Sequence, residues 1–277
     1  MAGKVYLGCA VWAHRGWLGR IYPTGTPAKQ FLSLYSHCFN TVEGNSTFYA
    51  VPKQELLYRW RQETHAEFRF ALKLPKEISH AAQLAPKVTA AQQFIEKMQA
   101  GLGDRLGCIF VQLPPSYSPS HWPDLQEFLS NLPRSTPLAL EVRHRNWFNP
   151  SQRHQLEQFL HQQQIAQVLL DTRPVYADPE NPRLAGERHK PNLPVHFSDP
   201  AGHILVRYIS HPDRNFNYDY MHLWADQISS WYSQGKTVYF FVHCPLEDYS
   251  PNNAKYFQEL LAEKGIKISC PQLQLFE

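Results

Sequence analysis

Closely spaced cysteine pairs are absent from this sequence of 277 residues. Its cysteines are odd in number and far apart along the chain: Cys9, Cys38, Cys108, Cys244 and Cys270. This spacing argues against a disulfide framework and against a structural zinc site, which uses closely spaced ligand pairs. We therefore expect buried free thiols. The histidines form no H-E-x-x-H sequence either, so the signature of a zinc peptidase helix is missing.

Long apolar runs are also missing. No stretch approaches the roughly 20 apolar residues of a membrane-spanning helix, and residues 1–5 lack the apolar region of a signal peptide. Hydrophobic residues make up 43% of the chain and charged residues 18%, which excludes a disordered or collagen-like chain. With 27 Lys and Arg against 24 Asp and Glu, the net charge is only +3. We expect a cytoplasmic globular protein without a membrane partner.

Short, nearly continuous apolar segments alternate with segments of helical periodicity along the chain. A parallel strand that is buried on both faces has such a continuous apolar sequence. The segments that we interpret as strands are residues 5–9, 41–43, 68–73, 107–112, 138–141, 167–171, 204–208 and 237–242. Between them, apolar residues recur at three- and four-residue steps, for example Val88, Ala91, Ile95, Met98 and Leu102. This alternation over about 250 residues predicts an α/β fold, the (β/α)8 TIM barrel.

The alternative architecture is an open, doubly wound sheet. Such sheets often carry a glycine-rich phosphate-binding turn after the first strand, but neither a G-x-G-x-x-G nor a Walker sequence follows residues 5–9. Three dipeptides that begin helices, Thr26-Pro27, Asn149-Pro150 and Ser250-Pro251, lie at the expected helix starts. The chain contains no internal repeat or linker. We expect a single domain over residues 1–277.

The connection between the sixth and seventh expected strands, residues 172–203, is long and irregular. It is rich in proline and has no helical period. A connection of this length is usually a lid, a binding loop or a disordered segment. Its stretch Glu187-Arg188-His189-Lys190 is basic. It would therefore either cover an anionic ligand or form a solvated loop, and the sequence leaves both open.

Polar and aromatic side chains cluster at the carboxyl ends of the expected strands, where barrel enzymes carry their active sites. Isolated charges at the ends of apolar strands are costly without partners, so these groups must form ion pairs with one another or bind a ligand. If they bind a ligand, the predicted catalytic residues are Glu43, Lys73, Glu141 and Asp171. The predicted substrate-binding residues are Trp12, His14, Asn45, Tyr49, Gln112, Arg143, Trp147, Arg207 and His243.

Three chemistries are compatible with these residues. A pair of carboxylates such as Glu43 and Glu141 would cleave a glycosidic bond, by a mechanism that depends on their separation. Lys73, with its pKa lowered by burial, would form a Schiff base with a carbonyl substrate. Both glutamates, Asp171 and His243 would hold a divalent metal, although ligands on four strands have no spacing signature. We predict no cofactor and leave a divalent metal open.

Four segments carry a resemblance that covers nearly the whole chain. They are Val42-Glu43-Gly44-Asn45-Ser46-Thr47-Phe48-Tyr49, Phe68-Arg69-Phe70-Ala71-Leu72-Lys73, Gln112-Leu113-Pro114-Pro115 and Glu141-Val142-Arg143-His144. In order and spacing they resemble the motifs of the YecE-like family of bacterial and archaeal proteins of unknown function. The resemblance implies a TIM barrel with an open cavity at the carboxyl ends of the strands. It implies no established reaction.

The eighth expected strand departs from the pattern of the broader family. Many members have Tyr-Phe-Asn-Asn there, whereas this sequence has Phe240-Phe241-Val242-His243-Cys244-Pro245. This run is similar to the YecE subgroup of the family. A role that belongs to the asparagine pair is therefore not carried over, and a subgroup-specific use of His243 is open.

Three hypotheses for function follow. The leading one is an enzyme, a hydrolase or an isomerase or lyase, that acts on a small anionic substrate bearing phosphate or carboxylate. Arginine binds such groups in bidentate geometry, and Arg143 and Arg207 would do so together with Lys73. The second is a nucleic-acid-binding or metal-dependent phosphodiester-cleaving protein. The third is a non-catalytic ligand-binding barrel. The substrate and the oligomeric state stay open.

Overall fold

The computed structural model describes residues 2–185, 190–198 and 200–270. Within them, eight strands form one parallel sheet in the order β1-β8-β7-β6-β5-β4-β3-β2. The strands are β1 (Lys4–Cys9), β2 (Thr41–Gly44), β3 (Arg69–Lys73), β4 (Leu106–Gln112), β5 (Leu138–Glu141), β6 (Ala166–Asp171), β7 (His203–Ile209) and β8 (Thr237–His243). The predicted TIM barrel is confirmed, and each predicted strand end lies within one residue of the observed end.

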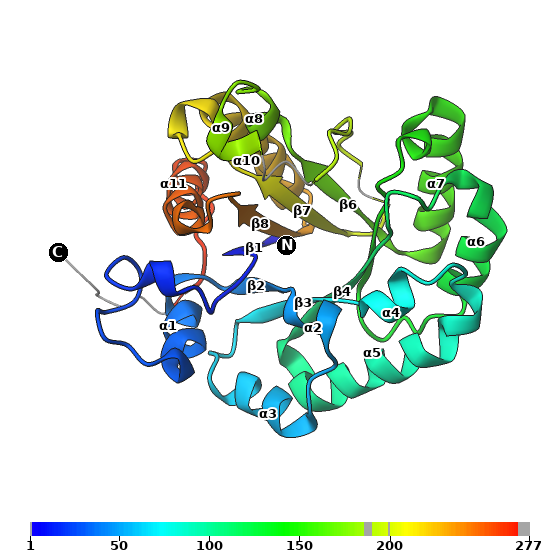
Figure 1. The fold of residues 1–277 in the computed structure, drawn as a ribbon, viewed down its shortest axis with the longest axis horizontal. Helices are drawn as coiled ribbons and strands as arrows, with labels where there is room; N and C mark the ends of the chain where they lie inside the picture. Colours follow the sequence, from blue (N-terminus) through cyan, green and yellow to red (C-terminus); the bar gives the residue numbers. More distant parts are fainter. Residues whose placement is uncertain (1, 186–189, 199, 271–277) are drawn as a thin grey trace.

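Helices surround the sheet (Figure 1). The longer ones are α1 (Phe31–Cys38), α3 (Gln54–Gln62), α5 (Val88–Leu102), α6 (Trp122–Ser130), α7 (Pro150–Gln163), α10 (Tyr218–Ser233) and α11 (Ser250–Glu263). The predicted apolar stripe of α5 is buried at Ala91, Ile95, Met98 and Leu102. Shorter helical turns are Arg15–Trp17, Ala28–Gln30, Ala85–Lys87, Gly103–Arg105, Pro119–His121, Arg145–Phe148, Arg214–Phe216 and Glu247–Tyr249.

Four one-turn helices follow the strands on the side of their carboxyl ends or lie in the long connection. They are α2 (Ser46–Tyr49), α4 (Lys76–Ser79), α8 (Arg173–Tyr176) and α9 (Pro182–Ala185). The last two lie in residues 172–203, which were expected to be irregular, and the sequence shows no helical period there because a single turn is too short to contain one. Residues 187–189 of the basic stretch lie outside the described residues, whereas Lys190 lies within them. In the described chain, no helix is long and apolar enough to cross a membrane.

Side chains join β1 to β2, where the described strands have no ladder of backbone hydrogen bonds. The Asn40 amide accepts a hydrogen bond from the Leu7 N–H at 2.8 Å and donates one to the Val5 carbonyl at 3.0 Å. Gly8 lets the strands approach, since a Cβ there would lie 1.9 Å from the Thr41 carbonyl oxygen. The barrel is therefore nearly closed.

The interior of the barrel is filled with apolar side chains below its carboxyl-terminal mouth. They include Ala71, Phe110, Ala139, Leu205 and Phe241, which form one buried cluster. The larger core lies between the sheet and the helices. All five cysteines are free, and the expected burial is confirmed for Cys9, Cys108 and Cys244, whereas Cys38 and Cys270 are partly exposed.

Candidate functional site

A layer of polar side chains lies directly above this apolar plug. Along a strand, every second side chain points into the barrel, so the next inward positions after Ala71, Phe110, Ala139, Leu205 and Phe241 are Lys73, Gln112, Glu141, Arg207 and His243. Glu43 of β2 joins them through hydrogen bonds to β7 and β8. The sequence prediction that these six residues converge at the strand ends is therefore confirmed by the contacts of their side chains. We call them, together with Arg143, the mouth cluster.

Arg207 is the centre of the mouth cluster. Its Nε and Nη2 donate to the two carboxylate oxygens of Glu43 at 2.8 and 2.9 Å. Its Nη1 donates to Glu141 Oε2 at 2.7 Å. Arg207 and both glutamates are buried. A single guanidinium thus binds two buried carboxylates, Glu43 in the bidentate geometry that arginine favours and Glu141 through one hydrogen bond.

Further donors complete the coordination of the two carboxylates. Arg143 donates from Nε to Glu141 at 2.6 Å and from Nη2 to Gln112 at 2.9 Å. The Lys73 ammonium lies 3.4 Å from Glu43 Oε1, and His243 Nε2 lies 2.8 Å from Glu43 Oε2. Because an ionised carboxylate only accepts hydrogen bonds, His243 carries its proton on Nε2.

The electrostatics of the cluster keep both glutamates ionised. Burial would raise the pKa of Glu43, but Arg207, His243 and Lys73 hold it well below its usual value. Burial is likewise outweighed at Glu141, where Arg143 and Arg207 lower the pKa to about 2. Burial and the neighbouring Arg207 lower the pKa of Lys73 to about 8. Burial lowers the pKa of His243 to about 4, so its imidazole is neutral at pH 7.

Two residues that were not predicted as site residues lie next to the cluster. Lys190 is close enough for its charge to interact with those of Arg207 and Glu43, and burial lowers its pKa to about 8. Burial raises the pKa of Glu247 to about 8, and its Oε1 has no hydrogen-bond partner among the described residues. The basic stretch that ends at Lys190 was a signal for the first. The sequence holds no signal for the second.

Asp171 does not join the mouth cluster, contrary to the expected convergence. It accepts hydrogen bonds from Arg173 Nη2 at 2.7 Å and from the Trp224 indole at 2.8 Å. The reason is the alternation of β6, in which Ala166 and Val168 point into the barrel and Asp171 has the opposite parity. Its carboxylate therefore faces α10 and stabilises the start of the long connection.

Several predicted binding residues have structural partners instead. Trp147 is buried and its indole donates to the Tyr117 carbonyl at 2.8 Å. The Asn45 amide donates to the Ala10 carbonyl at 2.7 Å. Trp12 packs edge-on against Trp60. These three contacts join the segments that follow the strands to one another or, for Trp12, to α3, and none of them is made with a residue of the cluster.

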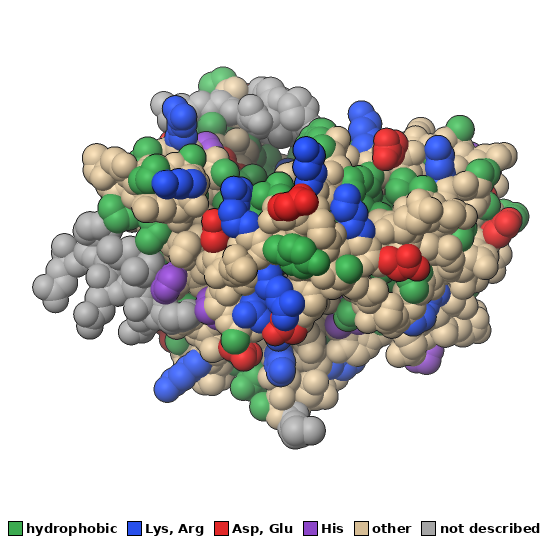
Figure 2. Space-filling model, turned by 90° about the horizontal axis from the view of Figure 1, so that it is seen from below, with side chains coloured by type: hydrophobic (Ala, Val, Ile, Leu, Met, Phe, Trp, Pro, Cys, Tyr) green, Lys and Arg blue, Asp and Glu red, His purple; other side chains and the backbone are tan. Residues whose placement is uncertain are grey.

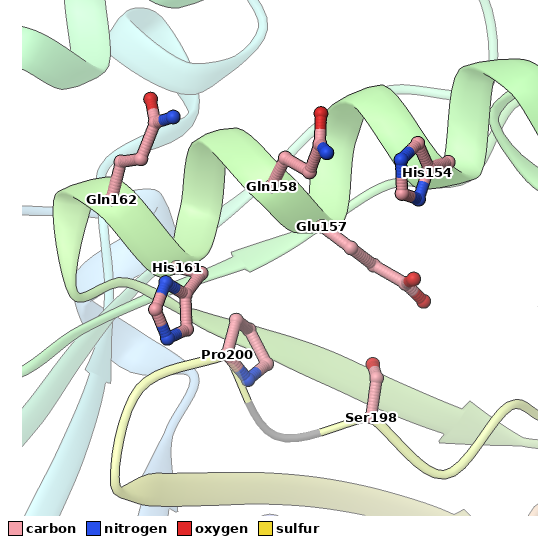
Figure 3. A pocket seen from close by; sticks show the side chains of 7 residues that line it. All are labelled: His154, Glu157, Gln158, His161, Gln162, Ser198 and Pro200. Atoms are coloured by element: carbon pink, nitrogen blue, oxygen red, sulfur yellow. The ribbon is translucent and has the colours of Figure 1, made fainter.

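Two further predicted residues are accessible. His14 pairs with Asp248 at 2.6 Å and is partly exposed. Tyr49 is 80% exposed and lines a hollow of about 490 Å³ between α2 and α4. Another hollow, of about 500 Å³, lies beside α7, where Glu157 projects toward Ser198 and His161 lies beside Pro200 (Figure 3). Since Ser198 contacts Gln167 near the amino end of β6, this second hollow is away from the strand ends that carry the cluster.

A divalent metal finds no ligand set in the residues that the structure describes. No group of three or more His, Cys, Asp or Glu side chains there is arranged to hold one. The oxygens of Glu43 and Glu141 are already bonded to arginine and histidine nitrogens. The four proposed metal ligands do not converge, because Asp171 points away.

The fold and the site define an α/β barrel with a buried, cation-rich cluster at the carboxyl ends of its strands. The chain belongs to the family described as Protein of unknown function DUF72, which matches residues 6–275. It is 36% identical over 244 residues to UPF0759 protein YecE of Escherichia coli O157:H7, covering 87% of this chain and 86% of YecE. It is 22% identical to UPF0759 protein YunF of Bacillus subtilis, covering 98% and 100% of the two chains.

Two solved structures have the same fold. A DUF72 family protein from Enterococcus faecalis V583 matches with a TM-score of 0.74 at 18% identity, covering 99% of this chain and 100% of that one. A DUF72 family protein from Thermotoga maritima matches with a TM-score of 0.72 at 20% identity, covering 94% and 99%. The YecE-like family predicted from the motifs is thereby confirmed.

Proposed function

We propose that the mouth of the barrel binds a small anionic substrate bearing phosphate or carboxylate, and that the protein is an enzyme acting on it. The balance of charge carries this proposal. The cationic side chains at the mouth are Lys73, Arg143, Lys190 and Arg207. The carboxylates among them are those of Glu43 and Glu141, which both form ion pairs with Arg207. The cations outnumber the carboxylates two to one, and this excess favours an anionic ligand.

Arg143 is the side chain best suited to receive the anion. Arg207 is buried and uses each of its guanidinium nitrogens on the two glutamates. Arg143 is partly exposed, and its Nη1 makes no hydrogen bond within the described chain. A phosphate or carboxylate oxygen would accept a hydrogen bond from that nitrogen.

The pKa values separate the fixed charges at the mouth from its two amines, Lys73 and Lys190, whose pKa values are both about 8. A glycosidase general acid needs a raised pKa, whereas the pKa of both glutamates is lowered. They therefore serve as fixed negative charges that hold the cations in place. Lys73, with its pKa near 8, is the member of the cluster that would gain and lose a proton during the reaction.

Calorimetric titration with inorganic phosphate and with malonate tests the anion site, using one anion of each class. Both should bind to the wild-type protein, and Arg143→Gln should weaken binding about tenfold, because a hydrogen bond to a charged group is lost. Arg153→Gln removes the same charge from an ion pair on α7 and should leave binding unchanged. Failure of both anions to bind the wild type, or equal weakening by the two variants, would contradict the proposal.

Turnover is tested separately from binding. A panel of phosphate monoesters and oxo acids is incubated with the protein and followed by NMR. Conversion of one compound, abolished by Lys73→Met, supports the enzyme. An anion that binds but is never converted would assign the protein as a ligand-binding barrel without catalysis.

A further inference from the structure

Residues of α2 and α4, and of the segments beside these helices, line the hollow. These helices directly follow β2 and β3, the strands that carry Glu43 and Lys73. The hollow has a volume of about 490 Å³, within the range of small-molecule sites. Its walls include Phe48, Tyr49, Ala50, Val51 and His80.

The ring of Phe48 is the wall between the hollow and the cluster. The Lys73 ammonium lies 5.5 Å from the centre of this ring. Tyr49 and His80 contact it edge-on, at centroid distances of 5.2 and 5.1 Å. One ring therefore separates the amine of the cluster from the space of the hollow, and a ligand that reaches past Phe48 would contact both.

The hollow beside the charged site presents exposed aromatic and aliphatic surface and has no net charge. Tyr49 is 80% exposed and Val51 is 40% exposed, so large side chains face open space where burial would be favourable. His80 adds a neutral imidazole, since burial and Arg143 lower its pKa. Lys76 and Glu77 line the same hollow with opposite charges. The hollow itself therefore suits an uncharged group.

We propose that the hollow binds a planar ring of the same substrate whose anionic group lies in the mouth cluster. The inference rests on the proposed function and narrows the substrate to aryl or heteroaryl phosphates and carboxylates. Phe48, Tyr49 and His80 supply the π faces and edges against which such a ring packs. Stacking of a ring on an aromatic side chain is a contact that a ringless anion lacks.

Calorimetric titration with phenyl phosphate and methyl phosphate separates the ring from the anion, since the two differ only in that group. Phenyl phosphate should bind the wild-type protein about tenfold more tightly. Ala50→Trp fills the hollow. It should lower the affinity for phenyl phosphate to near that for methyl phosphate and leave the affinity for methyl phosphate unchanged. Tyr49→Ala should also reduce the preference. Tyr218→Ala removes an exposed tyrosine from α10 and should leave the preference for phenyl phosphate unchanged.

The outcomes distinguish the two proposals. Equal affinity for both phosphates in the wild type would overturn the ring site and leave the anion site standing. A preference for phenyl phosphate that survives both Ala50→Trp and Tyr49→Ala would also overturn the ring site. Failure of both phosphates to bind would overturn the proposed function and, with it, the ring site.

Discussion

Arg207 concentrates the energetics of the site in one side chain. Its guanidinium bonds to Glu43 and Glu141 inside a buried layer. Two buried carboxylates would repel each other without a cation between them, and their ionised state depends on that cation. The same contacts raise the pKa of Arg207 against the effect of its burial. Arg207 is therefore first a structural cation, whereas Arg143 is available to a ligand.

Replacing Arg207 should destabilise the protein strongly. Arg207→Gln leaves two buried carboxylates without their shared partner, which should lower the free energy of unfolding by about 3–5 kcal/mol. Urea unfolding measures this. The pair of Arg153 with Glu157, in which both side chains are partly exposed, is the control, and Arg153→Gln should cost less than about 1 kcal/mol. Adding Glu43→Gln and Glu141→Gln to the Arg207 variant removes the unpaired carboxylates and should restore much of the lost free energy of unfolding. If the triple variant were no more stable than Arg207→Gln, unpaired carboxylates would not be the cause of the loss.

The sequence predicts which polar residues lie at the carboxyl ends of the strands. It does not predict which of their side chains point into the barrel. Glu43, Lys73 and Arg207 end apolar strands and do converge. Asp171 also ends an apolar strand but has the other parity, and it binds Trp224 instead. Because Lys73, Gln112 and Glu141 are likewise the last residues of their strands, position at the strand end does not distinguish Asp171 from them, and the sequence does not show which face of β6 lines the barrel. Lys190 could be placed at the mouth only by the path of the long connection, which the sequence does not specify.

At the scale of elements, the strands were the most predictable part. A strand that is buried on both faces must be apolar over its length, and β4 and β6 are apolar at nearly every position. One-turn helices such as α8 were not predictable, because four residues do not contain a full hydrophobic period. The junction of β1 with β2 was not predictable either, since single side chains make its hydrogen bonds.

The junction between β1 and β2 should depend on Asn40. Asn40→Leu preserves the size of the side chain but leaves the Leu7 N–H and the Val5 carbonyl buried without partners. At about 1–3 kcal/mol for each of the two unsatisfied groups, the free energy of unfolding should fall by about 2–6 kcal/mol. Hydrogen exchange should also accelerate at Leu7. The control is Asn131, whose amide makes an exposed hydrogen bond to the Glu127 carbonyl of α6. A loss as large in Asn131→Leu would contradict the role assigned to Asn40.

At the scale of the whole molecule, charge separates the remaining hypotheses. The net charge is only +3. On the face shown in Figure 2, Lys and Arg side chains are interspersed with Asp and Glu. Nucleic-acid-binding proteins usually have their cationic side chains along one face or stripe of the surface. The cations proposed to bind the ligand lie instead within the mouth of the barrel. This distribution favours a small anion over a polymer as the ligand.

The pH dependence of stability combines two buried groups of opposite effect. The pKa of His243 is about 4 in the folded protein and near 6.5 when unfolded. Between pH 4 and 6.5 the His243 imidazole is protonated in the unfolded chain but not in the folded one, so this histidine lowers stability as the pH falls. The pKa of Glu247 is about 8 when folded, against 4.5. Between pH 4.5 and 8 the Glu247 carboxyl is protonated in the folded chain but not in the unfolded one, so this glutamate raises stability as the pH falls.

Single substitutions should therefore tilt the stability curve in opposite directions. Relative to wild type, His243→Gln should reduce the loss of unfolding free energy between pH 6.5 and 4.5 by about 2 kcal/mol, since each full proton difference contributes about 1.4 kcal/mol per pH unit. Glu247→Gln should increase that loss. Urea unfolding at the two pH values measures both changes. His154→Gln, which replaces an exposed histidine of α7, is the control for the loss of a histidine. Parallel curves for all variants would show that neither buried group is linked to folding, because linkage requires a pKa that changes between the folded and unfolded chains.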